Sequence, residues 1–175
     1  LMAGAGYDAV IMRDAQPNKH LLGPMAYFSA ALTNALPQKA KLTMTLDDQE
    51  PFEVHGLGVL LINFSKIQFD ITITHENEPR DGLFEVVILK AQTAFDLIPS
   101  LFAGILDRSG GNPDRGEAME LHRARRVRVE SDPPLEIQYD GEPTKLTTPF
   151  TAYVIPKAAR LIVSEEGYAA FEHER

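Results

Sequence analysis

The sequence contains no cysteine, which excludes thiol-based redox catalysis and cysteine-ligated zinc sites. It has no excess of basic residues either: the formal net charge is −8, whereas a general nucleic-acid-binding protein presents a basic surface. No apolar run reaches the length of about 18 residues that a membrane-spanning helix needs. We therefore expect a cytoplasmic protein without nucleic-acid partners, whose contact with membranes, if any, is peripheral.

The beginning of the chain lacks the basic flank and apolar core of a signal peptide. It is an apolar stretch that runs directly into Gly4 and Gly6, whereas natural N-termini are usually more polar. We therefore expect the chain to be a piece of a longer protein. The spacing of the two glycines leaves two interpretations open. A backbone turn that needs positive φ is favoured over a dinucleotide-binding loop, because Ala9 stands where that loop has its third glycine.

The residues that are present indicate one soluble domain. The chain has 175 residues, of which 44% are hydrophobic and 24% are charged. A chain of this length can bury a core without disulfides or metal ions. We expect the domain to cover residues 1–163 and to be followed by a polar tail at 164–175.

Most of the chain shows the short alternating or apolar runs that are typical of β-strands. The runs lie at residues 41–46, 52–55, 56–62, 67–74, 83–89, 123–129, 135–139, 151–155 and 160–163. Apolar residues at helical spacing predict helices at 17–36 and 93–106, and a short helix is predicted through Met119 and Leu121. This pattern predicts a mainly β fold, a β-sandwich of about nine short strands with two or three inserted helices.

Two acidic turns are the candidate functional sites. The first contains Glu78 and Asp81-Gly82 and precedes the run at 83–89; the second is Asp140-Gly141-Glu142 and follows the run at 135–139. Asp-Gly is the most common signal for a tight hairpin, so both turns have an ordinary structural explanation. Composition and spacing do not decide between two plain hairpins and two corners of one site.

Two further features also allow a structural and a functional interpretation. The arginines between residues 123 and 128 form either a salt-bridged, solvated strand, which is favoured in so acidic a chain, or a phosphate-binding cluster. The apolar segment at 93–106 is either a helix packed on a sheet, which is favoured, or the wall of a pocket for an apolar ligand.

Five short segments occur in the order and spacing of a known family. They are Gly4-Ala5-Gly6-Tyr7-Asp8-Ala9; Lys19 with Gly23-Pro24-Met25-Ala26-Tyr27 and Leu32; Asp81-Gly82-Leu83-Phe84-Glu85-Val86; Ala124-Arg125-Arg126-Val127-Arg128-Val129; and Asp140-Gly141-Glu142-Pro143. In this order the chain resembles the C-terminal domain of the diacylglycerol kinase catalytic family, which includes bacterial soluble lipid kinases and sphingosine kinases. No single segment is specific, but five together are.

The resemblance implies a role for each acidic turn. It implies a structural Mg²⁺ near a domain junction, held by Glu78, Asp81 and the main-chain carbonyl of Leu83. Mg²⁺ takes oxygen ligands and retains several waters, so few protein ligands suffice. The resemblance also implies that Asp140 or Glu142, with Glu142 slightly favoured, is the base that takes the proton from a lipid hydroxyl as it attacks the γ-phosphoryl group of ATP.

The resemblance implies that ATP is bound mainly by an N-terminal domain with a Gly-Gly-Asp-Gly-Thr loop, a motif that this chain does not contain. We therefore expect the substrate-side domain of an ATP-dependent lipid kinase that phosphorylates a diacylglycerol-like alcohol and is inactive in isolation. One departure favours an alternative, a non-catalytic lipid- or protein-binding module: the family's glycine-rich segment is missing between Asn63 and Asp70. Exposed strand edges also make a homodimer plausible.

Overall fold

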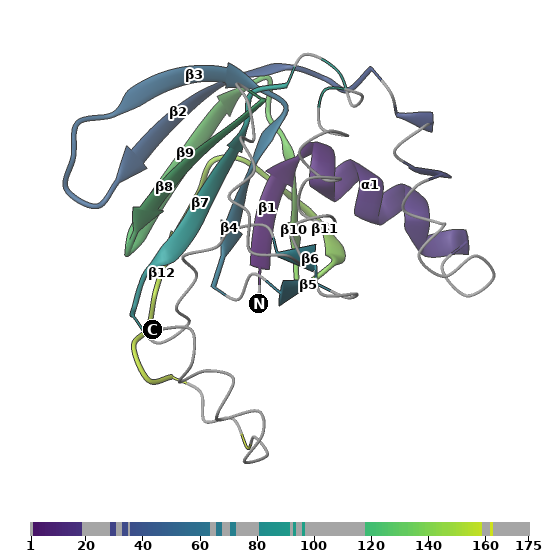
Figure 1. Ribbon diagram of the computed structural model, residues 1–175. Helices are drawn as coiled ribbons and strands as arrows, with labels where there is room; N and C mark the ends of the chain where they lie inside the picture. The colour runs from purple at the N-terminus through teal and green to yellow at the C-terminus, as the bar shows by residue number, and fades with distance from the viewer. Residues whose placement is uncertain are drawn as a thin grey trace.

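The computed structural model describes residues 2–18, 29–30, 33–34, 36–63, 66–67, 71–72, 81–91, 93, 96, 118–158 and 162, with the backbone alone at 18, 66–67 and 71–72. The elements in these residues are β1 (Met2–Gly6), α1 (Tyr7–Ala15), a 3₁₀ turn (Gln16–Asn18), β2 (Ala40–Leu46), β3 (Phe52–Gly56), β4 (Gly58–Ile62), β5 (Lys66–Ile67), β6 (Ile71–Thr72), β7 (Phe84–Leu89), β8 (Met119–Ala124), β9 (Arg126–Asp132), β10 (Glu136–Tyr139), β11 (Glu142–Thr147) and β12 (Phe150–Tyr153). Figure 1 shows their arrangement.

Ten of these strands form two antiparallel sheets. Sheet A has the order β11-β10-β1-β4-β7-β8 and sheet B the order β12-β9-β2-β3, while β5 and β6 pair only with each other. The chain passes from sheet A to sheet B at Arg125, between β8 and β9. The predicted mainly β sandwich is therefore confirmed.

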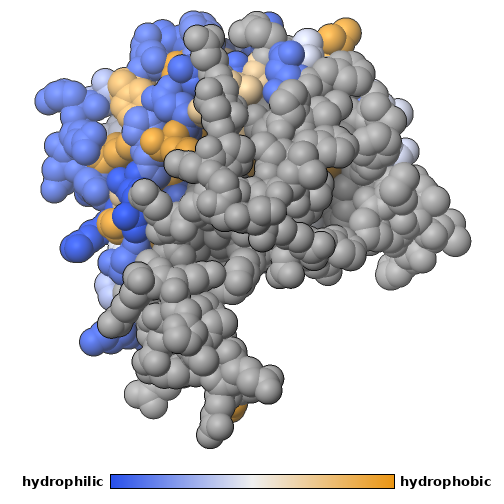
Figure 2. Space-filling view, in the orientation of Figure 1, coloured by the Kyte–Doolittle hydropathy of each residue, from blue (hydrophilic) through white to orange (hydrophobic). Residues whose placement is uncertain are grey.

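The main core lies between the two sheets. Alternate residues of β2 and β9 are buried there, so these strands show the period of two that a half-buried sheet requires. The buried apolar residues of this core are Ala5, Ala40, Leu42, Met44, Leu46, Val59, Leu61, Val86, Ile88, Ala124, Val127, Val129, Leu135 and Ile137. Burial on one face leaves the other face of sheet B to solvent, and Figure 2 shows mostly hydrophilic residues over β2 and β3.

The central strands β4 and β7 of sheet A are buried on both faces. All five residues of β4 are buried, and a second apolar cluster on its outer face joins β4 and β7 to Tyr7 and Ile11 of α1. This explains why residues 58–62 and 86–89 form continuous apolar runs while the strands of sheet B alternate.

Helix α1 was not predicted, because the sequence indicated only a turn after the opening strand. Gly6 makes the change of direction: its φ is 106°, and a Cβ there would lie 2.3 Å from the carbonyl oxygen of Leu57. The predicted positive-φ turn is thus confirmed at Gly6, and the nine residues of α1 follow it directly. The helix buries only one large residue, Tyr7, together with Ala9 and Ala15, so its sequence shows no clear helical period.

Two other predictions differ from the structure at the ends of sheet A. The predicted short helix through Met119 and Leu121 is wrong, because these residues belong to β8, which pairs with β7. Strand β11 was not predicted, because it is a mostly exposed edge strand that contains Pro143 and shows no burial pattern. Both strands obtain their conformation from a neighbour rather than from their own sequence.

The predicted runs at 41–46, 52–55, 56–62, 83–89, 135–139 and 151–155 correspond to strands. The run at 123–129 is divided between β8 and β9, and the run at 67–74 includes the short β5–β6 pair. The predicted helix at 17–36 begins with the 3₁₀ turn and is helical at 29–30 and 33, with most of its length outside the described residues. The predicted helix at 93–106, the strand at 160–163 and the tail at 164–175 lie almost entirely outside them.

Asp47 anchors the β2–β3 hairpin to the bend between β8 and β9, one of the places where the chain changes sheets. Its Oδ1 accepts hydrogen bonds of 2.8 Å from the backbone amides of both Arg125 and Arg126. We expect Asp47→Ala to lower the free energy of unfolding by about 2 kcal/mol, because two amides lose a charged acceptor. Urea denaturation measures the change.

Asp48→Ala is the matched control for Asp47→Ala. The Asp48 side chain is 97% exposed and forms an ion pair with Arg126. An exposed ion pair contributes little, so we expect a loss below about 0.5 kcal/mol. Equal losses in the two variants would contradict the fastening role of Asp47.

Candidate functional site

Asp140 and Gly141 form the two-residue loop of the β10–β11 hairpin. Both have positive φ, 50° and 80°, and the flanking residues Tyr139 and Glu142 are cross-strand partners. This is the conformation of a type I′ turn, which explains why an Asp-Gly pair occurs here. The hairpin interpretation of the sequence is therefore confirmed, and the turn exposes the carboxylates of Asp140 and Glu142.

The turn has anchors outside its own hairpin. Asp140 exchanges two hydrogen bonds with the backbone of Met2: its amide donates to the Met2 carbonyl at 2.8 Å, and its Oδ1 accepts from the Met2 amide at 2.9 Å. Glu142 Oε2 accepts a hydrogen bond of 2.9 Å from Gln16 Nε2. The two candidate bases are thus held by β1 and by the end of α1.

The first acidic turn precedes β7. Asp81 is partly buried, and its Oδ1 accepts a hydrogen bond of 2.7 Å from the amide of Leu83. Glu78, the third predicted metal ligand, lies outside the described residues. Within the described residues, no three acidic or histidine side chains lie close enough together to hold a metal ion.

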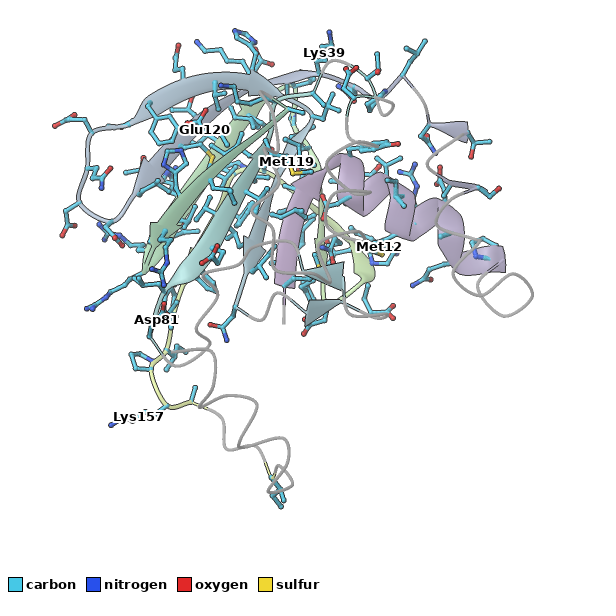
Figure 3. All side chains as sticks on the ribbon, in the orientation of Figure 1. Met12, Lys39, Asp81, Met119, Glu120 and Lys157 are labelled. Carbon is cyan, nitrogen blue, oxygen red and sulfur yellow. The ribbon has the colours of Figure 1, made fainter. Side chains whose placement is uncertain are left out.

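A cation of the chain itself lies at this turn. Arg123 of β8 forms an ion pair through Nη2 with Asp81 Oδ2, and its Nε lies 3.4 Å from Oε1 of the buried Glu85. Glu85 and Arg123 are cross-strand partners, so the register of β7 and β8 brings them together. Figure 3 shows Asp81 near the beginning of β7.

The two acidic turns lie at the same end of sheet A. The register follows one row across the sheet: Asp140 bonds Met2, Met2 lies opposite Ile62, and Ile62 lies opposite Glu85. Three interstrand steps separate β10 from β7, which corresponds to about 14 Å at the usual strand spacing. That distance excludes one metal ion shared by both turns, because Mg²⁺–oxygen distances are only about 2 Å.

A buried polar pair that the sequence analysis did not identify lies behind the second turn. Gln138 is fully buried; its Nε2 donates to Asp8 Oδ2 at 2.8 Å, and its Oε1 accepts from the amide of Gly141 at 2.9 Å. Gly4 makes room for this pair, since a Cβ there would lie 2.0 Å from Asp8 Oδ2. The spacing of Gly4 and Asp8 is the only sign of this buried pair that the sequence offers.

The arginines of 123–128 mostly make ion pairs within the chain. Arg126 pairs with Asp48, and Arg128 Nε pairs with Glu130 at 2.8 Å, in addition to the pair of Arg123 with Asp81. These contacts favour the salt-bridged strand over a phosphate-binding cluster. Within the described residues, none of the helices has the length and apolar character needed to cross a bilayer.

Burial raises the pKa of the Asp8 carboxyl from 3.8 to about 6, and the hydrogen bond from Gln138 opposes this rise. Its Oδ1 is buried without a hydrogen-bond partner in the described part of the chain. A pKa that is raised in the folded state stabilises the protein below the unfolded pKa, and this stabilisation is lost as pH increases through the folded pKa.

We therefore expect wild-type protein to lose about 2 kcal/mol of stability relative to Asp8→Asn between pH 4 and pH 7.5. Urea denaturation across this range measures the difference. Asp14→Asn on the same helix is the control of opposite sign, because hydrogen bonds from Arg13 and Asn34 lower the pKa of Asp14. A difference between wild type and Asp8→Asn that is independent of pH would contradict the assignment.

Comparison with solved structures identifies the same sandwich. Two candidate diacylglycerol kinase structures from Bacillus anthracis str. Sterne match 89% of this chain and 50% of their own, with TM-scores of 0.63 and 0.61 and 17% sequence identity. A third structure, of a diacylglycerol kinase from the same organism, has a TM-score of 0.51 and 14% identity. At these identities the likeness concerns the fold.

Comparison of sequences identifies the family. An uncharacterized protein of Synechocystis sp. is 25% identical over 177 aligned residues, which cover 95% of this chain and 39% of that protein. The chain thus spans well under half of this relative and half of the solved structures. The family model for the YegS C-terminal NAD kinase beta sandwich-like domain matches residues 2–163. The chain therefore belongs to the family of YegS C-terminal NAD kinase beta sandwich-like domains.

Proposed function

We propose that this chain is the substrate-side domain of an ATP-dependent lipid kinase that phosphorylates a diacylglycerol-like alcohol. The observation that carries the proposal is the position of the two acidic turns at one end of sheet A, in a chain of this family. The candidate base and the candidate metal site therefore lie at the same end of the sheet. A second domain that binds ATP is required opposite that end.

In this proposal the second turn provides the base. A carboxylate of Glu142 or Asp140 accepts the proton of the lipid hydroxyl, the hydroxyl oxygen bonds to the γ-phosphorus of ATP, and ADP leaves with its electron pair. Both carboxylates are exposed, so a substrate reaches them without rearrangement of the core. Glu142 lies on the side of the turn that faces α1, through Gln16, and Asp140 on the side that faces β1.

Mg²⁺ at the first turn is also a proposal, with Asp81, the Leu83 carbonyl and Glu78 as ligands. Carboxylate and carbonyl oxygens are suitable ligands for Mg²⁺, so the donor types fit. When bound, the ion would supply positive charge beside the domain junction. Arg123 already neutralises Asp81 Oδ2, and the guanidinium has to move aside for an ion to bind that oxygen.

The pair of Arg123 and Asp81 favours a second candidate function. A guanidinium shared by Asp81 and Glu85 performs the charge neutralisation that a metal ion would perform. A domain of this kind is a non-catalytic lipid- or protein-binding module of the same family. The two functions differ in whether the carboxylates of the turns are needed for phosphoryl transfer.

We expect the double variant Glu142→Gln with Asp140→Asn to abolish lipid phosphorylation by the full-length protein that contains this domain. Loss of a general base costs about 10²- to 10⁴-fold in rate. Transfer of labelled phosphate from ATP to diacylglycerol in mixed micelles measures the rate, and the single variants identify which carboxylate is the base.

The matched control for this pair is Glu53→Gln with Asp48→Asn. Both residues belong to the β2–β3 hairpin of sheet B, and the exchanges of charge are the same. We expect this control to retain wild-type turnover. Turnover retained by the Glu142 and Asp140 double variant would rule out the kinase proposal and favour the binding module.

We expect Arg123→Gln to bind Mg²⁺ at least about tenfold more tightly than wild type, because removal of a positive charge next to Asp81 removes repulsion. Calorimetric titration with MgCl₂ measures the affinity. Arg126→Gln, which removes a guanidinium paired with Asp48 instead of Asp81, should leave the affinity unchanged. Binding that is unaffected by Arg123→Gln and by Asp81→Asn would show that Mg²⁺ does not bind at this turn.

A further inference from the structure

The β10–β11 hairpin requires polar anchors because packing provides few. Strand β11 is an edge strand of sheet A, and four of its six residues are exposed. Its turn also holds Asp140 at a φ of 50°, a region that non-glycine residues occupy rarely. Contacts from outside the hairpin therefore have to determine where Asp140 and Glu142 lie.

One face of α1 supplies these contacts. Residues 8, 12 and 16 are spaced four apart, so they lie along one side of the helix. Asp8 bonds the Gln138 side chain, and Gln16 at the end of the helix bonds Glu142. Between them, Met12 Sδ lies 3.9 Å from the position that a Cβ on Gly141 would occupy. Figure 3 shows Met12 on α1 at the side of the helix near the β10–β11 hairpin.

The hydrogen bond between Asp8 and Gln138 determines which way the Gln138 amide is oriented. The buried Gln138 side chain has one acceptor end and one donor end. Gly141 offers an N–H group, so it needs the Oε1 end, and the Nε2 end must then find an acceptor. Asp8 Oδ2 is that acceptor at 2.8 Å. A buried amide left without one partner is costly, so Asp8 selects the orientation that supports the turn.

We propose that Asp8 and Gln138 are positioning residues, which act together to fix the turn that presents Asp140 and Glu142. Asp8 orients the Gln138 amide, and the amide holds the Gly141 N–H. The structural part of this inference concerns the turn alone, whereas its catalytic consequence rests on the proposed function. Gly4 contributes to the same arrangement of contacts, because only a residue without a side chain leaves room for the Asp8 carboxylate.

Hydrogen exchange with mass spectrometry on the full-length protein tests the structural part. We expect Gln138→Met to accelerate exchange of the amides in peptides covering 140–142 by about tenfold, because the Gly141 N–H loses its acceptor at nearly constant side-chain volume. Asp8→Leu should have the same effect, since it removes the acceptor that orients Gln138. Asp8→Asn retains an acceptor oxygen and should retain wild-type exchange.

Gln49→Met is the matched control, because it makes the same exchange of side chain in the exposed β2–β3 turn. It should leave exchange at 140–142 unchanged. Circular dichroism establishes that each variant is folded; if Gln138→Met does not fold, the comparison of Asp8→Leu with Asp8→Asn decides. Wild-type exchange in both Gln138→Met and Asp8→Leu would overturn the proposal, as would equal acceleration in Asp8→Asn and Asp8→Leu.

The kinetic part separates this inference from the proposed function. In the lipid phosphorylation assay we expect Gln138→Met and Asp8→Leu to lower kcat about tenfold at an unchanged KM for ATP, because a displaced base affects the chemical step. Asp8→Asn should restore most of kcat. Accelerated exchange with wild-type kcat would overturn the positioning role. Absence of lipid phosphorylation by the wild type would overturn the proposed function, while the exchange pattern would still decide whether the pair fixes the turn.

Discussion

The fold requires other parts of the chain to pack against both faces of the central strands of sheet A. Residues of β4 and β7 are apolar on both sides, so one face packs on sheet B and the other on α1 and neighbouring apolar residues. Helix α1 can lie there only because the chain leaves β1 at Gly6 with a backbone conformation and a closeness to Leu57 that exclude a side chain. Once the helix lies on sheet A, its polar residues face the β10–β11 hairpin. The packing of α1 on sheet A therefore both buries the outer face of the central strands and supplies contacts to the second acidic turn.

The strands that could be predicted are those in which burial follows a regular pattern along the sequence. Strands such as β2 alternate, and β4 is continuously apolar, because each has a simple relation to the core. Helix α1 and strands β8 and β11 could not be predicted in this way. The helix buries few large residues, β8 is a strand because β7 pairs with it, and β11 is an exposed edge. Their conformations come from contacts that are distant in sequence.

In the candidate site, too, local features could be predicted from the sequence and contacts between distant residues could not. The sequence identified both Asp-Gly turns, because a turn of this type depends on the conformational preferences of two adjacent residues. It contained no local sign that the turns lie at the same end of sheet A, since that follows from the register of four strands. Nor did it reveal Arg123 beside Asp81, or Gln138 beside Asp8, because each of these contacts joins residues far apart in the chain. The roles of Glu78, Asp81, Leu83, Asp140 and Glu142 in metal binding and catalysis remain predictions.

The two turns also differ in how strongly the domain itself determines their geometry, and this difference bears on function. The second turn is held by a buried amide, by backbone bonds to β1 and by the end of α1, so its carboxylates are positioned before any substrate arrives. Such preorganisation is what a catalytic base needs, because a displaced group loses much of its effect. The first turn is instead neutralised by a long arginine side chain, which also lies against the buried Glu85 of β7. In the proposed function, the chemistry therefore belongs to the second turn, and the first turn would respond to an ion or a domain opposite it.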